Sequence, residues 1–263
     1  MSFELCKRLY EFVRKPKMIK DSSTECWNQA NINEWINIAQ TNDFRMYYIM
    51  PYTLEKLGDV KGKHILDLGC GDGGYSRALA HKGAFLTSAD CSEDMVGYAK
   101  NKAEEEGLRI DHHVINANAL NGIQKNYYDL VLCSMMLMDV EDLDGTLKEI
   151  HRVLKPKGTV FISILHPCFK GKETAWLKNN GSIQVLISDY HNPEKWVGEI
   201  KGMKDPVIYR HRTLSDYVKA FVGNNFKITD MNEPVPTKEQ VQKSPRVAWL
   251  KKIPMYLFIE LEK

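Results

Sequence analysis

Two carboxylates on either side of a glycine-rich turn are the part of this sequence best suited to chemistry. Asp67 lies near the end of a short apolar run, 64–68, and Gly69, Gly71 and Gly74 follow that run. A strand, a glycine-rich loop and a helix in that order aim backbone N–H groups and a helix N-terminus at a bound ligand. Asp90 comes about twenty residues later, where such units place a carboxylate against ribose hydroxyls. The spacing therefore predicts a nucleotide-type cofactor at this loop.

The position of Asp67 distinguishes between two cofactors. The glycine pattern also fits NAD-binding proteins, but a carboxylate two residues before Gly69 would face a pyrophosphate and repel it. A cofactor with a positively charged amino group would be attracted there, which favours S-adenosylmethionine over NAD. Two alternatives stay open. The protein could be a nicotinamide dehydrogenase, or Asp67 could merely cap the loop while the glycines form turns.

The elements that would position these residues alternate regularly along the chain. Residues 25–57 have apolar side chains at near-helical spacing, and the following region alternates short apolar strands with amphipathic helices. Continuous apolar strands alternating with helices are typical of a parallel sheet covered on both faces. We therefore expect an α/β fold with three layers and a Rossmann-like sheet. The strands are expected at 64–68, 85–89, 110–115, 128–133 and 159–165, with helices at 75–83, 92–107 and 143–154 between them.

The alternation stops after Leu165 and resumes at residue 213. Residues 166–212 are rich in Trp, Tyr, Lys and Gly without a clear period, so we expect an irregular insertion that caps the site. Thr213 to Asp216 form a capping-box pattern that begins a helix, and strands are expected at 226–231 and 255–261. The whole chain, 1–263, is interpreted as one domain. Its parts are a helical cover at 1–60, a cofactor-binding core at 61–165, the cap at 166–212, and a helix with the last two strands at 213–263.

Composition excludes several classes of protein. Among 263 residues, 43% are hydrophobic and 27% are charged, which argues against disorder, and a net charge of +2 argues against a nucleic-acid-binding surface. The six cysteines include no CxxC pair, so neither a zinc site nor a disulfide framework is expected. Residues 1–17 are charged throughout, unlike a signal peptide, and the longest apolar run, 130–138, is less than half a bilayer crossing. We expect a cytoplasmic protein without metal or membrane partners.

Three segments together resemble the class I S-adenosylmethionine-dependent methyltransferases. ILDLGCGDGGYSRALA (65–80) resembles the first motif of this family, ADCSEDM (89–95) its acidic second motif, and LKEIHRVLKPKGTVFIS (147–163) the segment through its fifth strand. The resemblance is strong from about residue 45 to residue 165. It implies a seven-stranded sheet whose last strand is antiparallel, plus N-terminal helices and an inserted cap. The cofactor would lie over the carboxyl ends of the first strands.

The resemblance also implies roles for single residues. Gly69 and Gly71 would pass under the methionine part of the cofactor, Asp67 would face its amino group, and Asp90 would hold the ribose. Two alternatives stay open, because Met95 is equally a core residue and Arg45 equally a solvated one. Asn118 departs from the Asp that the family usually has at this position, but its amide oxygen could still accept a hydrogen bond. The remaining implied contacts are Cys91 and Met95 with the adenine, Asn118 and Ala119 with the adenine amino group, Ser134 near the methyl group, and Arg45 with the cofactor carboxylate.

The candidates for chemistry on the methyl acceptor lie in or beside the insertion. His166 follows the fifth strand and could act as a general base, or it could hold the loop by a structural hydrogen bond. His211 and Arg212 end the insertion, and Tyr190 lies within it. Trp176 and Trp196 offer apolar walls for an organic substrate. His112 and His113 are neighbours on a strand and point to opposite faces, which argues against a metal pair.

The residues after the fourth strand narrow the acceptor. Cys133-Ser134-Met135-Met136 replaces the Asn- or Asp-Pro-Pro-aromatic run of family members that methylate exocyclic amines or glutamine amides. Asp139 alone is too little for a catechol-type metal site. The interpretation is a methyltransferase for a small molecule, either a metabolite or a natural product. A protein or RNA methyltransferase on the same fold and a non-catalytic S-adenosylmethionine-binding protein remain alternatives, and the oligomeric state is open.

Overall fold

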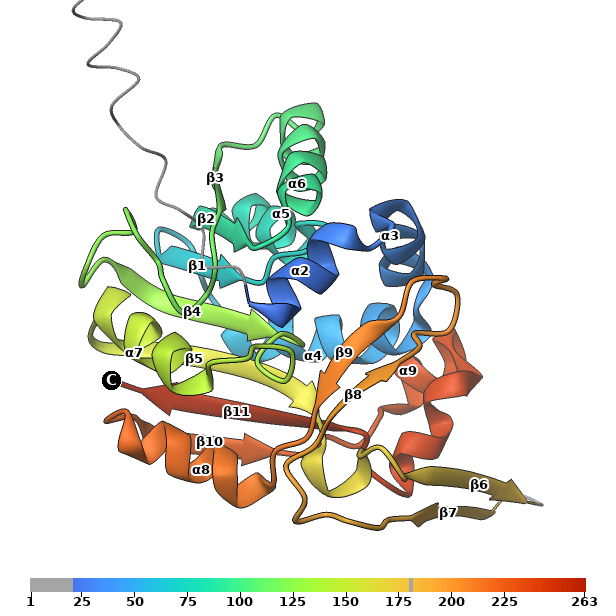
Figure 1. Cartoon of the computed structure of the whole chain (residues 1–263). Coiled ribbons are helices and arrows are strands. Elements are labelled where there is room, and N and C mark those ends of the chain that lie inside the picture. The colour runs from blue at the N-terminus through green and yellow to red at the C-terminus, as the bar shows by residue number, and fades with distance from the viewer. Residues whose placement is uncertain (1–20, 180–181) are drawn as a thin grey trace, which may run out of the picture.

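A computed structural model describes residues 21–179 and 182–263, and within these ranges a seven-stranded mixed sheet forms the centre of the fold (Figure 1). β11 is antiparallel to both of its neighbours, whereas β1 to β5 are mutually parallel. The predicted seven-stranded Rossmann-like sheet with its last strand antiparallel is thereby confirmed. The strand order is β10 (Lys227–Asn232), β11 (Tyr256–Glu262), β5 (Leu154–Leu165), β4 (Tyr128–Ser134), β1 (His64–Leu68), β2 (Phe85–Asp90) and β3 (Ile110–Val114).

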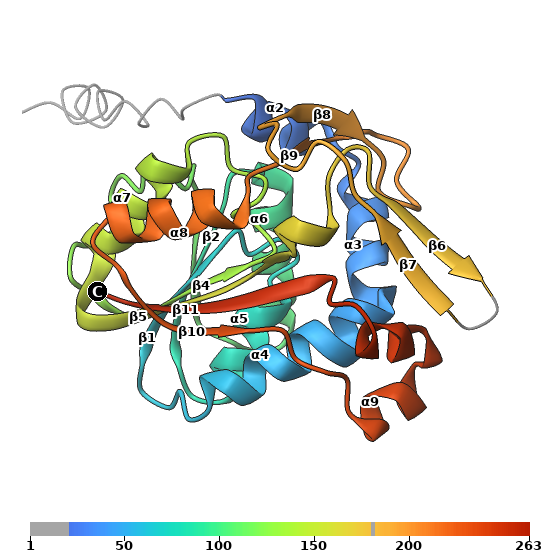
Figure 2. The same cartoon turned by 90° about the horizontal axis from the view of Figure 1, so that it is seen from below.

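Helices cover both faces of this sheet, which gives the three layers (Figure 2). The apolar stripe that predicts a helix from Leu143 becomes α7 (Leu143–Val153), with Leu147 and Ile150 fully buried. Thr213 and Asp216 form the predicted capping box of α8 (Leu214–Gly223), which packs beside α7. The other face carries α4 (Met50–Leu57) and α5 (Gly74–His81), and α6 (Glu93–Glu105) contacts β2 and β3.

Between residues 21 and 49 the amino-terminal cover has two short helices and a π-helical turn. Asp21 caps α2 (Ser22–Gln29) through the N–H of Thr24, and α3 (Ile32–Thr41) and η1 (Arg45–Ile49) lead into α4. Cys6 and the stretch 1–17, on which the signal-peptide argument depends, lie outside the described residues. None of the helices in 21–179 and 182–263 is long and apolar enough to cross a bilayer.

The insertion is more regular than expected, so the prediction of an irregular cap is wrong. β6 (Ala175–Asn179) pairs with β7 (Ser182–Leu186), and β8 (Lys195–Gly198) pairs with β9 (Val207–Arg210), as two antiparallel hairpins. These strands are four or five residues long and mostly half-exposed, so the sequence shows only a weak alternation of apolar and polar side chains. The link between β10 and β11 likewise contains two short helices, α9 (Lys238–Lys243) and η3 (Pro245–Lys251).

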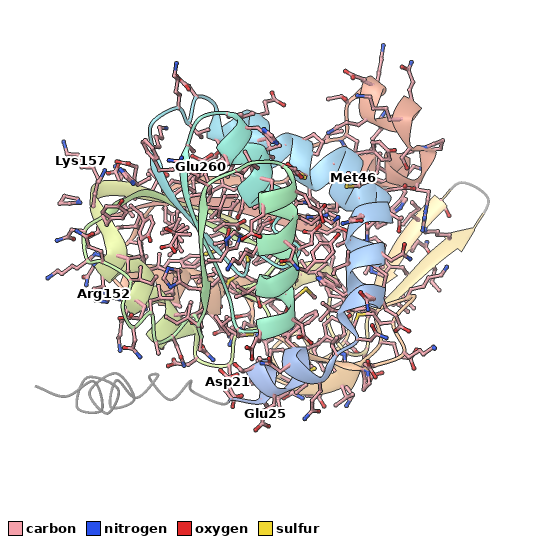
Figure 3. The ribbon with its side chains drawn as sticks, turned by 90° about the horizontal axis from the view of Figure 1, so that it is seen from above. Asp21, Glu25, Met46, Arg152, Lys157 and Glu260 are labelled. Carbon is pink, nitrogen blue, oxygen red and sulfur yellow. The ribbon has the colours of Figure 1, made fainter. Side chains whose placement is uncertain are left out.

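The cover and the second hairpin meet at the carboxyl ends of the parallel strands. In Figure 1 the arrowheads of β4 and β5 point toward the side where α2 and the β8–β9 hairpin lie, whereas β11 points away from it. In Figure 3 Asp21 and Glu25 mark α2, and Arg152 and Lys157 lie on a different side of the molecule. Ligands in open parallel sheets bind outside the carboxyl ends of the strands.

Candidate functional site

A cavity of about 300 Å³ occupies this edge of the sheet, beneath α2, α3 and the β8–β9 hairpin. It brings together residues from the glycine loop, from the ends of β2 and β4, and from the amino-terminal cover. Six of the site residues named from the sequence lie elsewhere: Asp67, Ala119, His166, Tyr190, His211 and Arg212. The predicted residues that line the cavity are Arg45, Gly69, Gly71, Asp90, Cys91, Met95, Asn118 and Ser134.

The glycine loop and Asp90 form one unit. The Asp90 carboxylate accepts the Gly71 N–H at 3.0 Å with one oxygen and the Ser92 N–H at 2.9 Å with the other. Burial raises the pKa of Asp90, and these two hydrogen bonds oppose the rise. A carboxylate offers about four lone-pair sites, so each oxygen retains capacity for a further donor. Asp90 can therefore hold the loop and a ligand diol together.

Gly69 is required by both its backbone and its surroundings. Its φ is +73°, and a Cβ added there would lie 2.6 Å from the Cβ of Met136. Side chains larger than hydrogen disfavour this left-handed conformation, and no ordinary contact is so short. The glycine therefore lets the loop pass directly against the segment that follows β4.

Asp67 supports the loop from behind and does not line the cavity. It is 1% exposed and accepts a hydrogen bond of 2.6 Å from Ser76 Oγ, which itself accepts one from Ser88 Oγ. Burial is the main cause that raises the pKa of Asp67 to about 6. This placement agrees with the alternative in which Asp67 stabilises the loop.

The adenine end of the predicted site contains an unused acceptor. Asn118 Oδ1 is buried and has no hydrogen-bond partner within residues 21–179 and 182–263, while the Asn118 N–H donates to Asn116 Oδ1. Met95 is 2% exposed and lines the cavity, so it is both a core residue and a wall. In this segment the alanine that reaches the cavity is Ala117, two residues before the predicted Ala119.

Arg45 is held in place and is not a solvated side chain. Its guanidinium donates to Asp72 Oδ1 at 2.7 Å and to the Ala39 carbonyl at 2.8 Å. A Cβ on Gly74 would lie 2.6 Å from Arg45 Nη2, so this glycine leaves room for the arginine to cross the start of α5. The crossing places a fixed positive charge beside the glycine loop.

The other end of the cavity is largely apolar, and the loop after β4 brings two carboxylates to it. Asp142 caps α7 by accepting the Gly145 N–H at 2.8 Å. Asp139, in the loop after β4, lines the cavity, and its carboxylate has no hydrogen bond or ion pair within the described residues. Burial raises the pKa of Asp139 to about 7, although Arg210 and Arg212 oppose the rise. The apolar walls around this end come from Trp27, Trp35, Ile38, Ile49, Met135, Met136, Met138, Leu165, Ile200, Val207, Tyr209 and Tyr256.

The histidines predicted for chemistry are used structurally. His166 is 3% exposed, its Nδ1 accepts the Cys168 N–H at 3.1 Å, and its Nε2 donates to Glu233 at 2.5 Å. Burial lowers the pKa of His166, although Glu233 opposes the change, and both ring nitrogens are occupied. His211 Nε2 donates to the Tyr190 carbonyl at 2.7 Å.

The other two candidates also bind the backbone. Tyr190 accepts the Leu214 N–H at its hydroxyl, at 2.9 Å. Arg212 donates to the carbonyls of Leu137, Val140 and Glu141. These side chains lie beside the cavity and hold its walls in place.

The two tryptophans predicted to form walls for the substrate pack against other aromatic side chains of the chain. Trp176 packs edge-on against Trp249, and Trp196 stacks on Tyr209 at 5.4 Å between ring centroids. Tyr209 is the member of this group that reaches the cavity.

Arg210 is a central residue that the sequence analysis missed. With 8% of its side chain exposed, it donates to Ser22 and Ser23 of α2, to the Asp139 carbonyl, and to Glu141. No local pattern distinguishes it from its neighbour Arg212, because its partners come from segments far away in the sequence. Within residues 21–179 and 182–263 no three His, Cys, Asp or Glu side chains are grouped to hold a metal ion.

Comparisons with known proteins agree with this geometry. A family profile described as "Methyltransferase domain" matches residues 66–162. A ubiquinone biosynthesis O-methyltransferase from Aeromonas salmonicida is 33% identical over 74% of this chain and 81% of that protein. One of the same name from Coxiella burnetii is 33% identical, but the match spans only 57% of this chain and 61% of that protein. The crystal structure of an S-adenosylmethionine-dependent methyltransferase from Mesorhizobium loti superposes with a TM-score of 0.70 at 26% identity, over 85% of this chain and 99% of that one.

Proposed function

The chain belongs to the class I S-adenosylmethionine-dependent methyltransferases, and on that premise we propose that it transfers a methyl group to a hydroxyl oxygen of a small, largely apolar molecule. The observation that carries the proposal is that one cavity runs from the glycine loop and Asp90 to an apolar end beneath the cap. Oxygen is proposed as the methylated atom because the relatives are named O-methyltransferases.

The residues at the first end of the cavity fit S-adenosylmethionine. Asp90 has free lone pairs for the ribose, and the buried Asn118 oxygen lacks a donor that an adenine amino group would provide. The Arg45 guanidinium, which is already paired with Asp72, lies beside the loop where a carboxylate would bind. Gly69 and Gly71 would lie under the methionine part, and Cys91, Met95 and Ser134 would form further walls. When bound, S-adenosylmethionine supplies an electrophilic methyl group. The protein must then hold the acceptor in line with it and exclude water.

The lining of the cavity favours a small acceptor over a protein or RNA. The amino-terminal helices and the β8–β9 hairpin cover the apolar end, and the lining includes Trp27, Trp35 and Tyr209. Such a pocket suits an organic ring better than a polymer that must lie along a groove.

No base role is proposed for His166, because Cys168 and Glu233 occupy both of its nitrogens. We propose that His211, Tyr190 and Arg212 are positioning residues. They fix the cap and the loop after β4, on which the acceptor end of the cavity depends.

Two measurements test this function. Titration calorimetry should detect S-adenosylhomocysteine binding and no comparable binding of NAD. Incubation of the protein and S-adenosylmethionine with small-molecule extracts should give a product heavier than its precursor by one methylene unit. Binding of NAD alone would contradict the family assignment of the site. Binding of S-adenosylhomocysteine with methylation only of a macromolecular fraction would contradict the small acceptor. No methylated product in any fraction would favour a non-catalytic binding protein.

A further inference from the structure

We propose that Asp139 accepts the proton of the acceptor hydroxyl, and that the acceptor is therefore a ring-containing phenol or enol with an otherwise apolar body. This inference rests on the proposed function and adds the group that recognises the reacting atom. It starts from the apolar end of the cavity, where the Asp139 carboxylate has no partner among the described residues, whereas that of Asp142 in the same loop caps α7.

The loop after β4 is bent so that it turns toward the cavity. Met135 has a φ of +58°, a conformation uncommon for a residue other than glycine, and its N–H donates to the Ser163 carbonyl at 2.8 Å. The Asp139 N–H closes a turn onto the Met136 carbonyl at 2.9 Å. Residues in sparsely populated conformations persist only where the surroundings hold them, and they concentrate at functional sites. The bend brings Met135, Met136, Met138 and Asp139 to the cavity wall.

The backbone of Asp139 is held firmly while its carboxylate is left without a partner. Its carbonyl accepts hydrogen bonds from Ser23 and from Arg210, and Arg212 binds the carbonyls on either side of it. Within residues 21–179 and 182–263 neither arginine bonds to the carboxylate itself. Asp139 is half-buried, and charges withdrawn from water are normally paired. A fixed and unpaired carboxylate in an apolar pocket is therefore suited to a donor that arrives with the ligand.

Burial and three charged groups set the electrostatics of this carboxylate. Arg210 and Arg212 favour its charged form, whereas burial and the nearby charge of Asp90 favour its neutral form, with the result that its pKa lies at about 7. Tyr209 faces the same region, and burial together with Asp139 raises the pKa of that tyrosine to about 12. A carboxylate with a pKa close to neutrality accepts a proton better than an ordinary one and is still substantially ionised at pH 7.

In the proposed transfer the acceptor oxygen gains a methyl group, Asp139 gains a proton and the sulfur of the donor keeps an electron pair. As the bond between the acceptor oxygen and the methyl carbon forms, the O–H bond breaks and its proton passes to the Asp139 carboxylate. The electron pair of the donor's C–S bond remains on sulfur. An acidic hydroxyl on a ring matches this carboxylate, and the indole and phenol faces of Trp27, Trp35 and Tyr209 match the ring.

The test measures binding, so it does not depend on finding the natural acceptor. The full chain is saturated with S-adenosylhomocysteine, and the affinities of 2-naphthol and 2-methoxynaphthalene are measured by calorimetry. These two probes share one ring system, and only the first has an O–H donor. Asp139→Asn keeps the shape of the side chain and removes its charge, and Asp139→Ala removes the acceptor. Asp111→Asn, on the exposed edge of the sheet, is the matched control.

The wild type is expected to prefer 2-naphthol by roughly tenfold or more, as a charge-assisted hydrogen bond allows. Asp139→Asn should reduce this preference about fivefold and Asp139→Ala further, with unchanged affinity for S-adenosylhomocysteine and for 2-methoxynaphthalene. An equal loss for both probes would overturn the proposal, because Asp139 would then be only part of the wall. Absence of any preference in the wild type would overturn it as well. If S-adenosylhomocysteine itself fails to bind, the proposed function has failed, and this inference falls with it.

Discussion

At the scale of single residues, Asp90 joins the fold to the proposed cofactor site. Its two oxygens hold the N–H groups of Gly71 and Ser92, and the same oxygens border the cavity. A residue that organises the loop and contacts the ligand should be more sensitive to substitution than one that does either alone.

Asp90→Ala should therefore weaken S-adenosylhomocysteine binding about a hundredfold or more, since two charge-assisted hydrogen bonds of about 1.5–3 kcal/mol each would be lost. Calorimetry measures the affinity, and thermal unfolding shows whether the variant remains folded. Asp94→Ala, exposed in the first turn of α6, should bind like the wild type. A folded Asp90→Ala protein with unchanged affinity would remove Asp90 from the site.

Asp67 should act on stability through its protonation. Its pKa is about 6 in the folded protein, against an ordinary value of 3.8, so folding takes up a proton between these two pH values. The folded state then binds more protons than the unfolded one. The free energy of unfolding consequently falls as pH rises through this window, by about 3 kcal/mol from this group.

In Asp67→Asn this contribution to the pH dependence should be absent. Urea unfolding between pH 4 and pH 7 compares the slopes of the variant and the wild type. We also expect less than a tenfold loss of S-adenosylhomocysteine affinity, because Asp67 lies behind the loop. Identical slopes would contradict the buried, proton-binding role, and a large loss of affinity at constant stability would return Asp67 to the cofactor site.

At the scale of elements, the loop between β1 and α5 must follow one path. Gly69 combines a left-handed backbone with close approach to Met136. Two other glycines serve as references, one with the left-handed backbone alone and one with neither feature. Gly107 has φ +67° and nothing within 4 Å of an added Cβ, whereas Gly97 lies in α6 with open space and ordinary helical backbone.

Three alanine variants should accordingly rank in order. Gly97→Ala should stabilise the protein by up to about 1 kcal/mol, and Gly107→Ala should destabilise it by about 1–2 kcal/mol. Gly69→Ala should cost more than Gly107→Ala and should also weaken cofactor binding, because the loop or Met136 must move. Denaturant unfolding gives the order. Equal costs for Gly69→Ala and Gly107→Ala would mean that the contact with Met136 is easily relieved.

At the scale of the whole molecule, the cavity exists only because separate segments close over it. Arg210 of β9 connects α2 to the loop after β4, and Glu141 in that loop also accepts hydrogen bonds from Ser22. Opening of this contact would free α2, and with it one wall of the cavity.

Arg210→Ala should destabilise the protein by about 2–4 kcal/mol, since a buried, charge-assisted network loses its central donor. Hydrogen exchange should become faster in residues 21–30 and 137–142 and stay unchanged in β1 and β4. Arg246→Ala serves as the control, because that side chain is 68% exposed and makes one ion pair at 3.6 Å. Unchanged exchange in α2 would show that other contacts hold the cover.

What the sequence by itself determines is the part of the fold that depends on neighbouring residues. The apolar run 64–68 followed by glycines, the stripe of α7 and the capping box of α8 are all visible locally, because strand burial, helix periodicity and helix capping act over a few residues. The short hairpins of the insertion escape the same reasoning, since their half-exposed strands show little period.

Only the tertiary structure decides which side chains face the cavity. His166 follows a strand as a catalytic residue would, yet Glu233, 67 residues away, occupies one of its nitrogens. Arg210 and Arg212 are two arginines only two positions apart, but they bind different groups, which lie 69 to 188 residues away in the sequence. Asp139 is one of several acidic residues between 139 and 144 in the sequence. It becomes distinct because its backbone is clamped while its carboxylate has no partner among the described residues. Such pairings depend on how distant segments pack, and no local preference encodes that.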